Sequence, residues 1–280
     1  MSADEENPFL LGIDGTLLNA LASRKGRVLI AVPVRNAANT IEALFECILK
    51  LHYPRDNLSM AFLEGDSSDD TLQRLNRFAR QHAHSFRRLE VIKHDSGVIT
   101  PTPRWAPAMQ LSRRGNIARV RNELIKRALQ DEDWVLWVDA DIVKFPHDIL
   151  TAMLSTGAQI VHPNAVRKPR GESMDLNAWV TERQISVEAM ATWIQYGLYQ
   201  PPISFHRLYL SDLRYRDTVP LNSVGATMLL VNANIHRAGL LFPEHPYRWL
   251  IESEAFGAVA CELGIFPTGL PNVEVIHAPQ

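Results

Sequence analysis

The sequence predicts an α/β fold in which a mixed, mostly parallel sheet is flanked by helices, and two observations carry this prediction. Residues 27–93 alternate apolar runs of strand length with amphipathic segments of helix length, which is typical of a doubly wound nucleotide-binding half. The apolar run from Trp134 is too continuous for a half-exposed strand, and it ends in Asp139 and Asp141. Alternate side chains of a strand share a face, so both carboxylates should project together from the end of a buried strand.

The first half is expected to contain three strands and two helices that alternate along the chain. Its strands are rich in apolar residues, and its helices show an apolar stripe with the helical period. In chain order, these elements are a strand at 27–36, a helix that Thr40 caps, a strand at 58–64, a helix at 72–79 and a strand at 89–93.

Polar or turn-forming residues lie at the ends of the first two strands. Pro33, Arg35 and Asn36 end the first strand, and Asp66 and Asp70 follow the second. Ligands of open α/β sheets bind outside the carboxyl ends of the strands. We therefore expect these residues to hold the base and ribose of a nucleotide.

The second half is expected to begin with a long helix and to end with a strand. Its elements are a helix at 112–129 that Ser112 caps, a short helix at 147–154, a strand at 159–163, a strand at 221–231, a helical turn that ends at Gly239, a helix at 251–263 and a strand at 273–276.

Arg121 falls within the apolar stripe of the predicted long helix, whereas Arg119 and Asn122 fall on its polar side. A guanidinium that faces a core needs a carboxylate or a phosphate as its partner. Two interpretations stay open: Arg121 contacts a phosphate, or it forms a structural ion pair with a nearby acid such as Asp139 or Asp141.

Three further features of the second half concern a sugar substrate. Segment 165–220 mixes aromatic and polar residues, which suits the C–H faces of sugars, although core packing explains most of these aromatic residues equally well. Gly225 indicates close approach by a ligand or another backbone. Glu252 and Glu254 lie roughly 160° apart on their helix, so only one is expected to face a given site.

The paired acids also predict a cation site. Carboxylates attract hard cations such as Mg²⁺ or Mn²⁺, which can bridge to a diphosphate, although an acidic turn at a strand end is the alternative. The last strand should deliver His277 beside Asp139 and Asp141, where its imidazole could be a third ligand. The alternative for His277 is a surface position in a loose terminus.

Composition excludes several classes of protein. The 280 residues are 46% hydrophobic and 21% charged, as in ordinary globular proteins, and the net charge of −2 gives no reason to expect nucleic-acid binding. The two cysteines suggest neither a disulfide framework nor a zinc site. The acidic N-terminus does not resemble a signal peptide, and no apolar run reaches the ~18 residues of a membrane span. A cytoplasmic protein, either free or peripheral to a membrane, is expected.

The expected organisation is an N-terminal extension, residues 1–26, followed by a single domain over 27–280. Within this domain, 27–145 forms the nucleotide-binding half, and 146–280 forms an acceptor half that contains 165–220 as an insertion. The sequence does not indicate an oligomeric state.

From Arg27 to His277, the chain resembles the fungal Golgi mannan-polymerase mannosyltransferases, which form glycosyltransferase family 62 and adopt a GT-A fold. Their order along the chain makes the matching segments together far more specific than any one of them. These segments are 33–36, 66–71, 118–122, 138–143, 175–179, 224–227, 235–239, 251–256 and 269–272.

The resemblance implies a GT-A-like, nucleotide-diphospho-sugar transferase fold. It implies a retaining, metal-dependent enzyme that uses Mn²⁺ (or Mg²⁺) and transfers mannose from GDP-mannose. A carbohydrate or glycolipid acceptor is expected. The resemblance also implies that Asp139, Asp141 and His277 hold the metal. Members of that family carry an N-terminal membrane helix and act in the Golgi lumen. This sequence contains no apolar run of that length, so the localisation and the acceptor of the family do not carry over.

Each candidate residue thus has an expected role. The catalytic candidates are Asp175, Glu252 and Glu254, which could support the anomeric carbon, and Arg121, which would add positive charge near the departing diphosphate. Contacts with the nucleotide sugar are expected from Pro33, Arg35, Asn36, Asp66, Asp70, Arg119, Asn122, Asp139 and Gly225. Two alternatives stay open: another metal-dependent nucleotide-sugar enzyme (a nucleotidyltransferase or a hydrolase), and a non-catalytic subunit of a glycosyltransferase complex.

Overall fold

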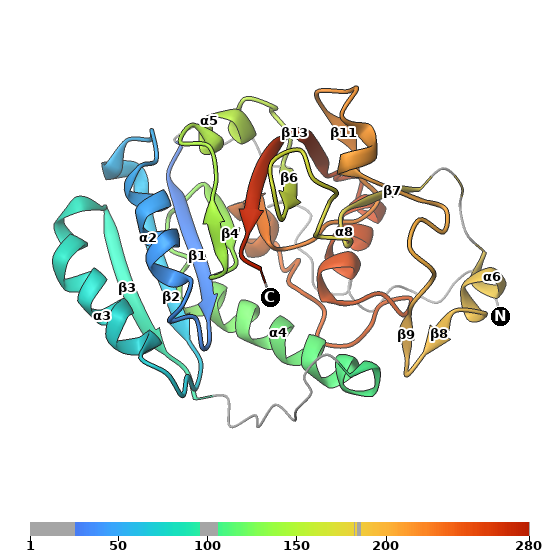
Figure 1. The fold of residues 1–280 in the computed structure, drawn as a ribbon, viewed down its shortest axis with the longest axis horizontal. Helices are drawn as coiled ribbons and strands as arrows, with labels where there is room; N and C mark the ends of the chain where they lie inside the picture. Colours follow the sequence, from blue (N-terminus) through green and yellow to red (C-terminus); the bar gives the residue numbers. More distant parts are fainter. Residues whose placement is uncertain (1–25, 96–105, 182, 184–185, 280) are drawn as a thin grey trace.

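A mixed sheet forms the centre of the protein (Figure 1), for which the computed structural model describes residues 26–95, 106–181, 183 and 186–279. The expected extension 1–26 therefore lies outside the described residues, except for Gly26. From edge to edge the sheet contains β11 (Val219–Pro220), β13 (Thr268–His277), β6 (Ile160–Val166), β12 (Met228–Asn232), β4 (Trp134–Val138), β1 (Val28–Val34), β2 (Leu58–Glu64) and β3 (Arg88–Lys93), and β5 (Ile142–Lys144) pairs with β13.

The strands of the first half form the parallel part of this sheet. β1 pairs in parallel with β2 and β4, and β2 pairs in parallel with β3. β12 runs antiparallel between β4 and β6, and β13 is parallel to β6. Every residue of β2 and β4 is buried, as expected for strands that are covered on both faces.

Helices cover the two faces of the sheet and create two hydrophobic cores. The alternation of side chains along β1 divides them: Val28, Ile30 and Val32 face one core, and Leu29 and Ala31 face the other. The first core is closed by α2 (Ile41–Leu49), α3 (Thr71–His82) and α5 (Ile149–Leu154), and the second by α4 (Pro107–Ala128), α7 (Ala233–Arg237) and α8 (Glu252–Glu262).

Shorter elements fill the connections. The long segment between β6 and β12 contributes Tyr199, Leu210 and Leu213 to the second core, so it is packed onto the main domain. The shorter elements are η1 (Arg55–Asn57), η2 (Ala83–Ser85), α6 (Val187–Ala191) and η3 (Leu210–Leu213), with the small sheets β7 (Trp179–Thr181)–β10 (Arg207–Tyr209) and β8 (Ile194–Gln195)–β9 (Leu198–Tyr199). None of the helices in the described ranges combines the length and the hydropathy that crossing a membrane requires.

Several predicted boundaries were wrong; the last strand, for example, begins at Thr268 and not at residue 273. The long helix begins at Pro107, because proline is tolerated in a first turn, where its missing N–H has no helical acceptor. Ser112 therefore lies inside this helix and does not cap it. The short helix begins at Ile149. The strand predicted at 221–231 is regular only from Met228, because the residues before it pack around the buried carboxylate of Asp175.

His236 in α7 is a buried, neutral imidazole with both ring nitrogens engaged. Its Nδ1 lies 2.9 Å from the carbonyl oxygen of Leu240, and its Nε2 accepts a hydrogen bond of 3.2 Å from the Trp137 indole. Only the Nδ1-protonated, neutral tautomer satisfies both contacts. Burial lowers the pKa of His236 to about 4, assisted by the Arg237 charge against the Leu240 contact.

Acidification should therefore destabilise the protein through His236. Between pH 6.5 and pH 4 the unfolded chain binds a proton at His236 that the folded chain does not. The contribution of the neutral His236 to the free energy of unfolding is therefore complete above pH 6.5 and is lost as pH falls. The loss should approach about 3 kcal/mol. Urea unfolding across this range should show a smaller dependence on pH for His236→Gln, and the exposed His84→Gln should behave like wild type. Equal pH dependence of His236→Gln and wild type would contradict this assignment.

Candidate active site

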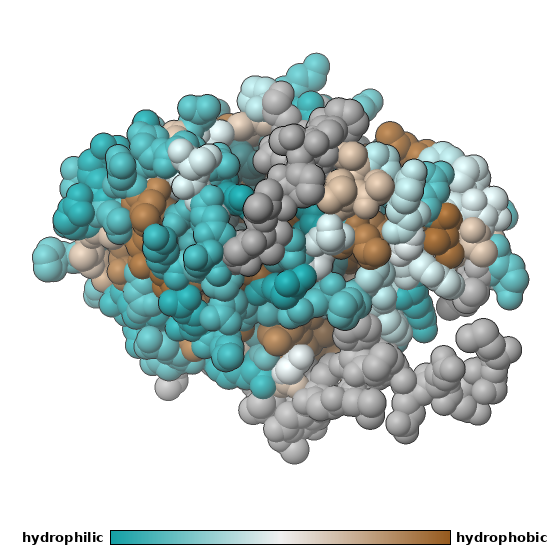
Figure 2. Space-filling view, turned by 90° about the horizontal axis from the view of Figure 1, so that it is seen from below, coloured by the Kyte–Doolittle hydropathy of each residue, from teal (hydrophilic) through white to brown (hydrophobic). Residues whose placement is uncertain are grey.

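The strands β1, β4 and β13 end at the same side of the sheet (Figure 1), and polar residues lie at or directly after their ends. Figure 2 shows the molecule from that side; hydrophilic residues predominate in its left part, and hydrophobic residues form smaller patches between them and on the right. Because this edge collects the carboxyl ends of the parallel strands, it is where an α/β sheet is expected to bind its ligand.

The loops after β1 and β2 are hydrogen-bonded to each other. The N–H of Asn36 donates to Ser67 Oγ at 2.9 Å, and the N–H of Ser68 donates to Asn36 Oδ1 at 2.8 Å. Asn36 and Asp66 both adopt left-handed backbone conformations, with φ of 50° and 52°. Such conformations are uncommon for residues other than glycine and cluster at functional sites. The structure thus brings together Asn36 and Asp66, two of the predicted nucleotide contacts.

The other residues predicted near the base and ribose differ in their surroundings. Pro33 is half-buried within β1, and Arg35 is exposed at its end. Asp70 precedes α3 and lies 2.9 Å from Arg74 Nη2, so its carboxylate is part of an exposed ion pair within one helical turn. This contact gives Asp70 a local partner, and its contact with a nucleotide stays a prediction.

The acid pair follows β4 directly, as predicted. The N–H of Asp139 donates to the Thr227 carbonyl at 2.9 Å, and Thr40 Oγ donates to the Ala140 carbonyl at 3.0 Å. These bonds attach the acidic loop to the chain before β12 and to the start of α2. The side chains of Asp139 and Asp141 keep 33% and 44% of their surface exposed, so solvent or a ligand can reach them.

His277 lies beside this loop, because β13 pairs with β5 and sets His277 opposite Ile142. Its Nε2 is 2.9 Å from Asp141 Oδ2, and its Nδ1 is 2.6 Å from the Ala278 carbonyl oxygen. Burial opposes a charged ring, but the hydrogen bond to Asp141 holds the pKa of His277 above its ordinary value. The predicted placement of His277 beside the acidic strand is therefore confirmed, and the alternative of a loose tail is wrong.

The donor set suits a divalent cation in part. In the described ranges, no three His, Cys, Asp or Glu side chains are already grouped as a metal site. Asp139 is bound to an arginine, and Asp141 and His277 face each other. However, Asp141 Oδ1 is buried without a hydrogen-bond partner among the described residues, and the contact of Nδ1 with Ala278 directs His277 Nε2 toward the acids. This is how histidine ligands of metals are usually oriented, so the residues present fit the cation.

Arg121 is the buried cation of the site. It is 5% exposed, and its guanidinium donates to Asp139 Oδ1 and to Glu252 Oε1, each at 3.1 Å. The guanidinium also lies 5.2 Å from the centre of the Phe242 ring. The structural ion pair, one of the two interpretations of Arg121, is thus present, and Asp139 is the acid that the sequence suggested.

The pKa of Asp139 is raised above its ordinary value. Desolvation is the main cause, and the charges of Asp141 and Asp175 add to it, whereas Arg121 opposes the shift. The negative charge of Asp175 therefore acts on Asp139. The site therefore concentrates negative charge that Arg121 neutralises only in part. Such an excess of negative charge favours the binding of a cation.

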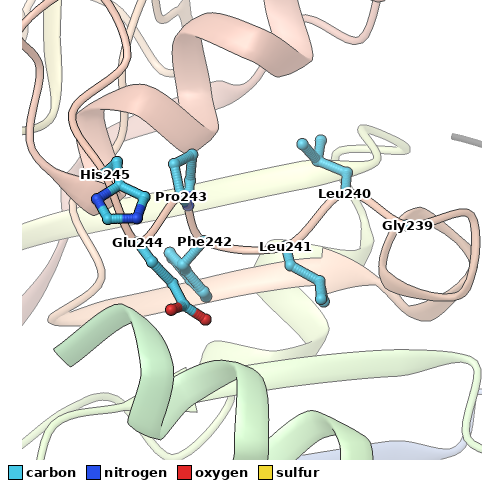
Figure 3. A pocket seen from close by; sticks show the side chains of 7 residues that line it. All are labelled: Gly239, Leu240, Leu241, Phe242, Pro243, Glu244 and His245. Carbon is cyan, nitrogen blue, oxygen red and sulfur yellow. The ribbon is translucent and has the colours of Figure 1, made fainter. Parts of the chain in front are cut away.

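Arg119 and Asn122, the other predicted residues of α4, face a different segment. Glu244 extends toward α4 (Figure 3) and lies 3.6 Å from Arg119 Nε. The Asn122 amide donates to the Phe242 carbonyl and accepts from the Phe242 N–H, both at 2.9 Å. Asn122 thus fixes the segment 239–245, which lines a cavity of about 270 Å³ (Figure 3) with seven consecutive residues. That cavity includes neither acid of the pair.

Asp175 is a buried anion, and its carboxylate lies directly against Gly225. Its carboxylate accepts hydrogen bonds from the N–H groups of Thr227 at 3.3 Å and Asn177 at 3.2 Å, and its Oδ2 lies 3.5 Å from His162 Nε2. Burial alone disfavours this anion, but His162 and the other donors hold the pKa of the Asp175 carboxyl far below its ordinary value. Close approach at Gly225 is confirmed, but the approaching group is the Asp175 side chain and not the ligand or backbone that was expected.

Glu252 and Glu254 face different partners, as their angular separation predicted. Glu252 Oε1 accepts from Arg121, and it also lies 3.4 Å from Arg114 Nη1. Glu254 Oε1 accepts from Arg207 at 3.0 Å and from the Trp179 indole at 2.9 Å. Desolvation raises the pKa of Glu254, although Arg207 and Trp179 oppose the shift.

Sequence reasoning missed two buried residues of the site, His162 and Arg207. His162 has a signal that could have found it, because His162 and Asn164 occupy alternate positions of the otherwise apolar strand β6 and so share a face. Arg207 has no comparable signal. Its burial depends on Glu254, which lies 47 residues later in the chain, and on the packing of β10 against β7.

The fold is shared with known glycosyltransferases. The mannosyltransferase PcManGT from Pyrobaculum calidifontis, solved in complex with GDP-Man and Mn²⁺, superposes with a TM-score of 0.54 at 16% identity, over 97% of this chain and 68% of that one. At this identity, the likeness establishes the fold alone. The predicted GT-A fold is therefore confirmed.

Two curated relatives come from Schizosaccharomyces pombe. The mannan polymerase II complex anp1 subunit is 29% identical over 284 residues, which cover 91% of this chain and 64% of the relative. The mannan polymerase complex subunit mnn9 is 28% identical over 281 residues, with coverages of 90% and 80%. The chain thus spans less than two thirds of the first relative. The family model named Anp1 matches residues 16–246, most of the chain, so this protein belongs to the Anp1 family.

Proposed function

We propose that this protein is a metal-dependent, retaining glycosyltransferase that moves mannose from GDP-mannose to a hydroxyl group of a glycan. The observation that carries the proposal is that Asp141 Oδ1, beside His277 at the edge where the parallel strands end, is buried and has no hydrogen-bond partner among the residues that the structure describes. The names of the relatives support mannan as the product, and the ligands of the archaeal structure support GDP-mannose and Mn²⁺.

Each residue then has a task. Asp139, Asp141 and His277 would hold the cation, and a bound Mn²⁺ or Mg²⁺ would neutralise the charge that develops on the departing diphosphate. Arg121 holds the Asp139 carboxylate in place and adds positive charge to the same region. Asp175 stays ionised, and its negative charge near the acid pair can stabilise the positive charge that develops at the anomeric carbon.

Replacing Asp141 tests the cation site. Asp141→Ala should weaken Mn²⁺-dependent nucleotide binding by at least about 10- to 100-fold. Mutating residues that only support metal ligands already causes a loss of this size, so removing a ligand should cause at least as much. Calorimetric titration and thermal unfolding with GDP, with and without Mn²⁺, measure this effect. The matched control is Asp148→Ala, at an exposed residue directly before α5, and it should bind like wild type. If Asp141→Ala binds GDP and Mn²⁺ as tightly as wild type, the site lies elsewhere.

The donor and the reaction need separate measurements. Titration with GDP, UDP and ADP in Mn²⁺ should rank GDP first, and a preference for UDP would contradict only the choice of donor. Incubation with GDP-mannose and a mannan fragment should extend the fragment by one sugar. Pyrophosphate release or hydrolysis alone would indicate a different nucleotide-sugar enzyme. Both relatives are named as subunits of a complex, which favours a non-catalytic role as the second candidate, and nucleotide binding without transfer would support it.

A further inference from the structure

A second cavity, of about 230 Å³, opens where α4, α8 and the segment between β6 and β12 meet. Its polar lining comes from separate elements, and the rest of the lining is mainly apolar. The polar side chains of the lining include Arg114, Asn177, Tyr199, Arg207, Tyr209 and Glu254. None of the predicted metal ligands lines it, so it is distinct from the cation site.

Arg207 is the fixed centre of this cavity. Its guanidinium lies 4.4 Å from the centre of the Trp179 ring and 5.3 Å from that of Tyr199, and it donates to Glu254 Oε1 at 3.0 Å. The side chain is 8% exposed. Two aromatic rings and a buried carboxylate thus hold the planar guanidinium in one orientation, and an arginine in this setting is not equivalent to a lysine.

Three donor groups of the cavity remain unpartnered. Nε and Nη2 of Arg207 and the hydroxyl of Tyr199 are buried and make no hydrogen bond within the described residues. A buried donor without a partner costs about 1–3 kcal/mol, so native proteins rarely keep one without a purpose. Both side chains are more than nine-tenths buried and line the same cavity. A ligand in the cavity that offers oxygen acceptors would supply the partners that these buried donors lack.

The charges of the cavity select a neutral ligand. Arg207 is paired with Glu254, and Arg114 lies 3.4 Å from Glu252. Each arginine therefore already has a carboxylate partner, and no unpaired cation of the lining calls for a phosphate. A sugar ring offers neutral hydroxyl oxygens to the donors and C–H faces to the apolar lining. The volume is below the ~300–1,000 Å³ of sites for drug-sized ligands, which suits a single ring.

The cavity also lies at a suitable distance from the acid pair. Arg114 and Arg121 are both on α4, seven residues apart, which corresponds to about 10 Å along the helix. Glu252 connects them, because it accepts from both arginines, and Arg121 in turn binds Asp139. We infer that this cavity binds the terminal neutral hexose of the glycan acceptor. This inference rests on the proposed transferase function and assigns its acceptor subsite.

Tyr199→Phe is the most selective test, because it removes a hydroxyl that has no partner within the described part of the chain. The variant should unfold at the same temperature as wild type or slightly higher. Its affinity for methyl α-mannoside, measured by NMR titration of the intact protein, should fall about 2- to 10-fold. Arg207→Lys keeps the charge beside Glu254 and loses the two free donors, so it should also weaken binding.

The controls separate this subsite from the donor site. Tyr247→Phe removes a hydroxyl that bonds Glu262 at 2.8 Å and lies outside the cavity, so it should bind the mannoside like wild type. Titration with GDP and Mn²⁺ should be unchanged in Tyr199→Phe. If nucleotide binding fails in wild type, the proposed function fails, while the mannoside result still decides the cavity. Absence of mannoside binding in wild type, unchanged binding in both cavity variants, or tighter binding of mannose 6-phosphate than of the mannoside would overturn the inference.

Discussion

Arg121→Met is expected to lower the free energy of unfolding by about 3–5 kcal/mol, because it leaves buried carboxylates without their cation. Glu252 is 3% exposed, and its Oε1 would keep only the more distant Arg114 at 3.4 Å. Asp139, which is one third exposed, can relieve its own loss by taking up a proton. Most of the cost should therefore come from Glu252. Urea unfolding at pH 7 measures it.

A double-variant cycle assigns this cost to the buried pair. Removing both charges of a buried ion pair is often close to neutral, whereas removing one is not. Arg121→Met should therefore cost much less in a Glu252→Gln background than in wild type. Arg119→Met, two residues earlier on α4, is the matched control, because Arg119 has 58% of its side chain exposed and should change stability by less than about 0.5 kcal/mol. Equal costs of Arg121→Met in both backgrounds would refute the pair.

Binding experiments on the same variants separate the two roles of Arg121. The Glu252→Gln background should restore stability without restoring the positive charge. If Arg121 also serves the diphosphate, the stable double variant will still bind GDP and Mn²⁺ more weakly than Glu252→Gln alone. If Arg121 is purely structural, the two will bind equally.

The parts of the fold that local patterns specify were predictable from the sequence. β2 has the predicted limits, and Gly264 follows α8 with φ of 78°, as expected for a residue that ends a helix. The long helix α4 was predicted to start five residues too late, because the residues before it contain prolines and look irregular. Pro107 is compatible with a first helical turn, and the sequence alone did not show that the turn forms.

The site was predictable where one element carries two of its residues, and less so where distant elements meet. Asp139 and Asp141 directly follow the buried strand β4, which the sequence shows clearly and which places them at the edge of the sheet. The pairing of Arg207 with Glu254 depends on how the segment after β6 folds over α8, and no local pattern specifies that contact. The ion pair of Arg121 with Asp139 lies between these cases, because the stripe of α4 showed that a partner was needed and left its identity open.

Gly225→Ala is expected to be about as destabilising as loss of Arg121, at about 3–5 kcal/mol, for a steric reason. An added Cβ would lie 1.8 Å from Asp175 Oδ2 and 2.2 Å from its Cγ, far inside any allowed contact. Overpacking alone costs about 1–3 kcal/mol. Displacing the carboxylate would also break its hydrogen bonds from Thr227 and Asn177 and leave a buried anion without them. Gly65→Ala is the control, because its Cβ would meet its nearest neighbour at 3.8 Å.

The identity of the clashing group can be tested by removing it. Asp175→Ala should destabilise the protein by itself, because it leaves the N–H groups of Thr227 and Asn177 without their acceptor. In that background, however, Gly225→Ala should add less than about 1 kcal/mol, because the space that its methyl group needs is then empty. Urea unfolding of the four proteins in the cycle measures this coupling. Additive costs would show that Gly225 is required for a reason other than the Asp175 carboxylate. The buried anion would then not explain why the residues before Met228 do not continue β12 as a regular strand.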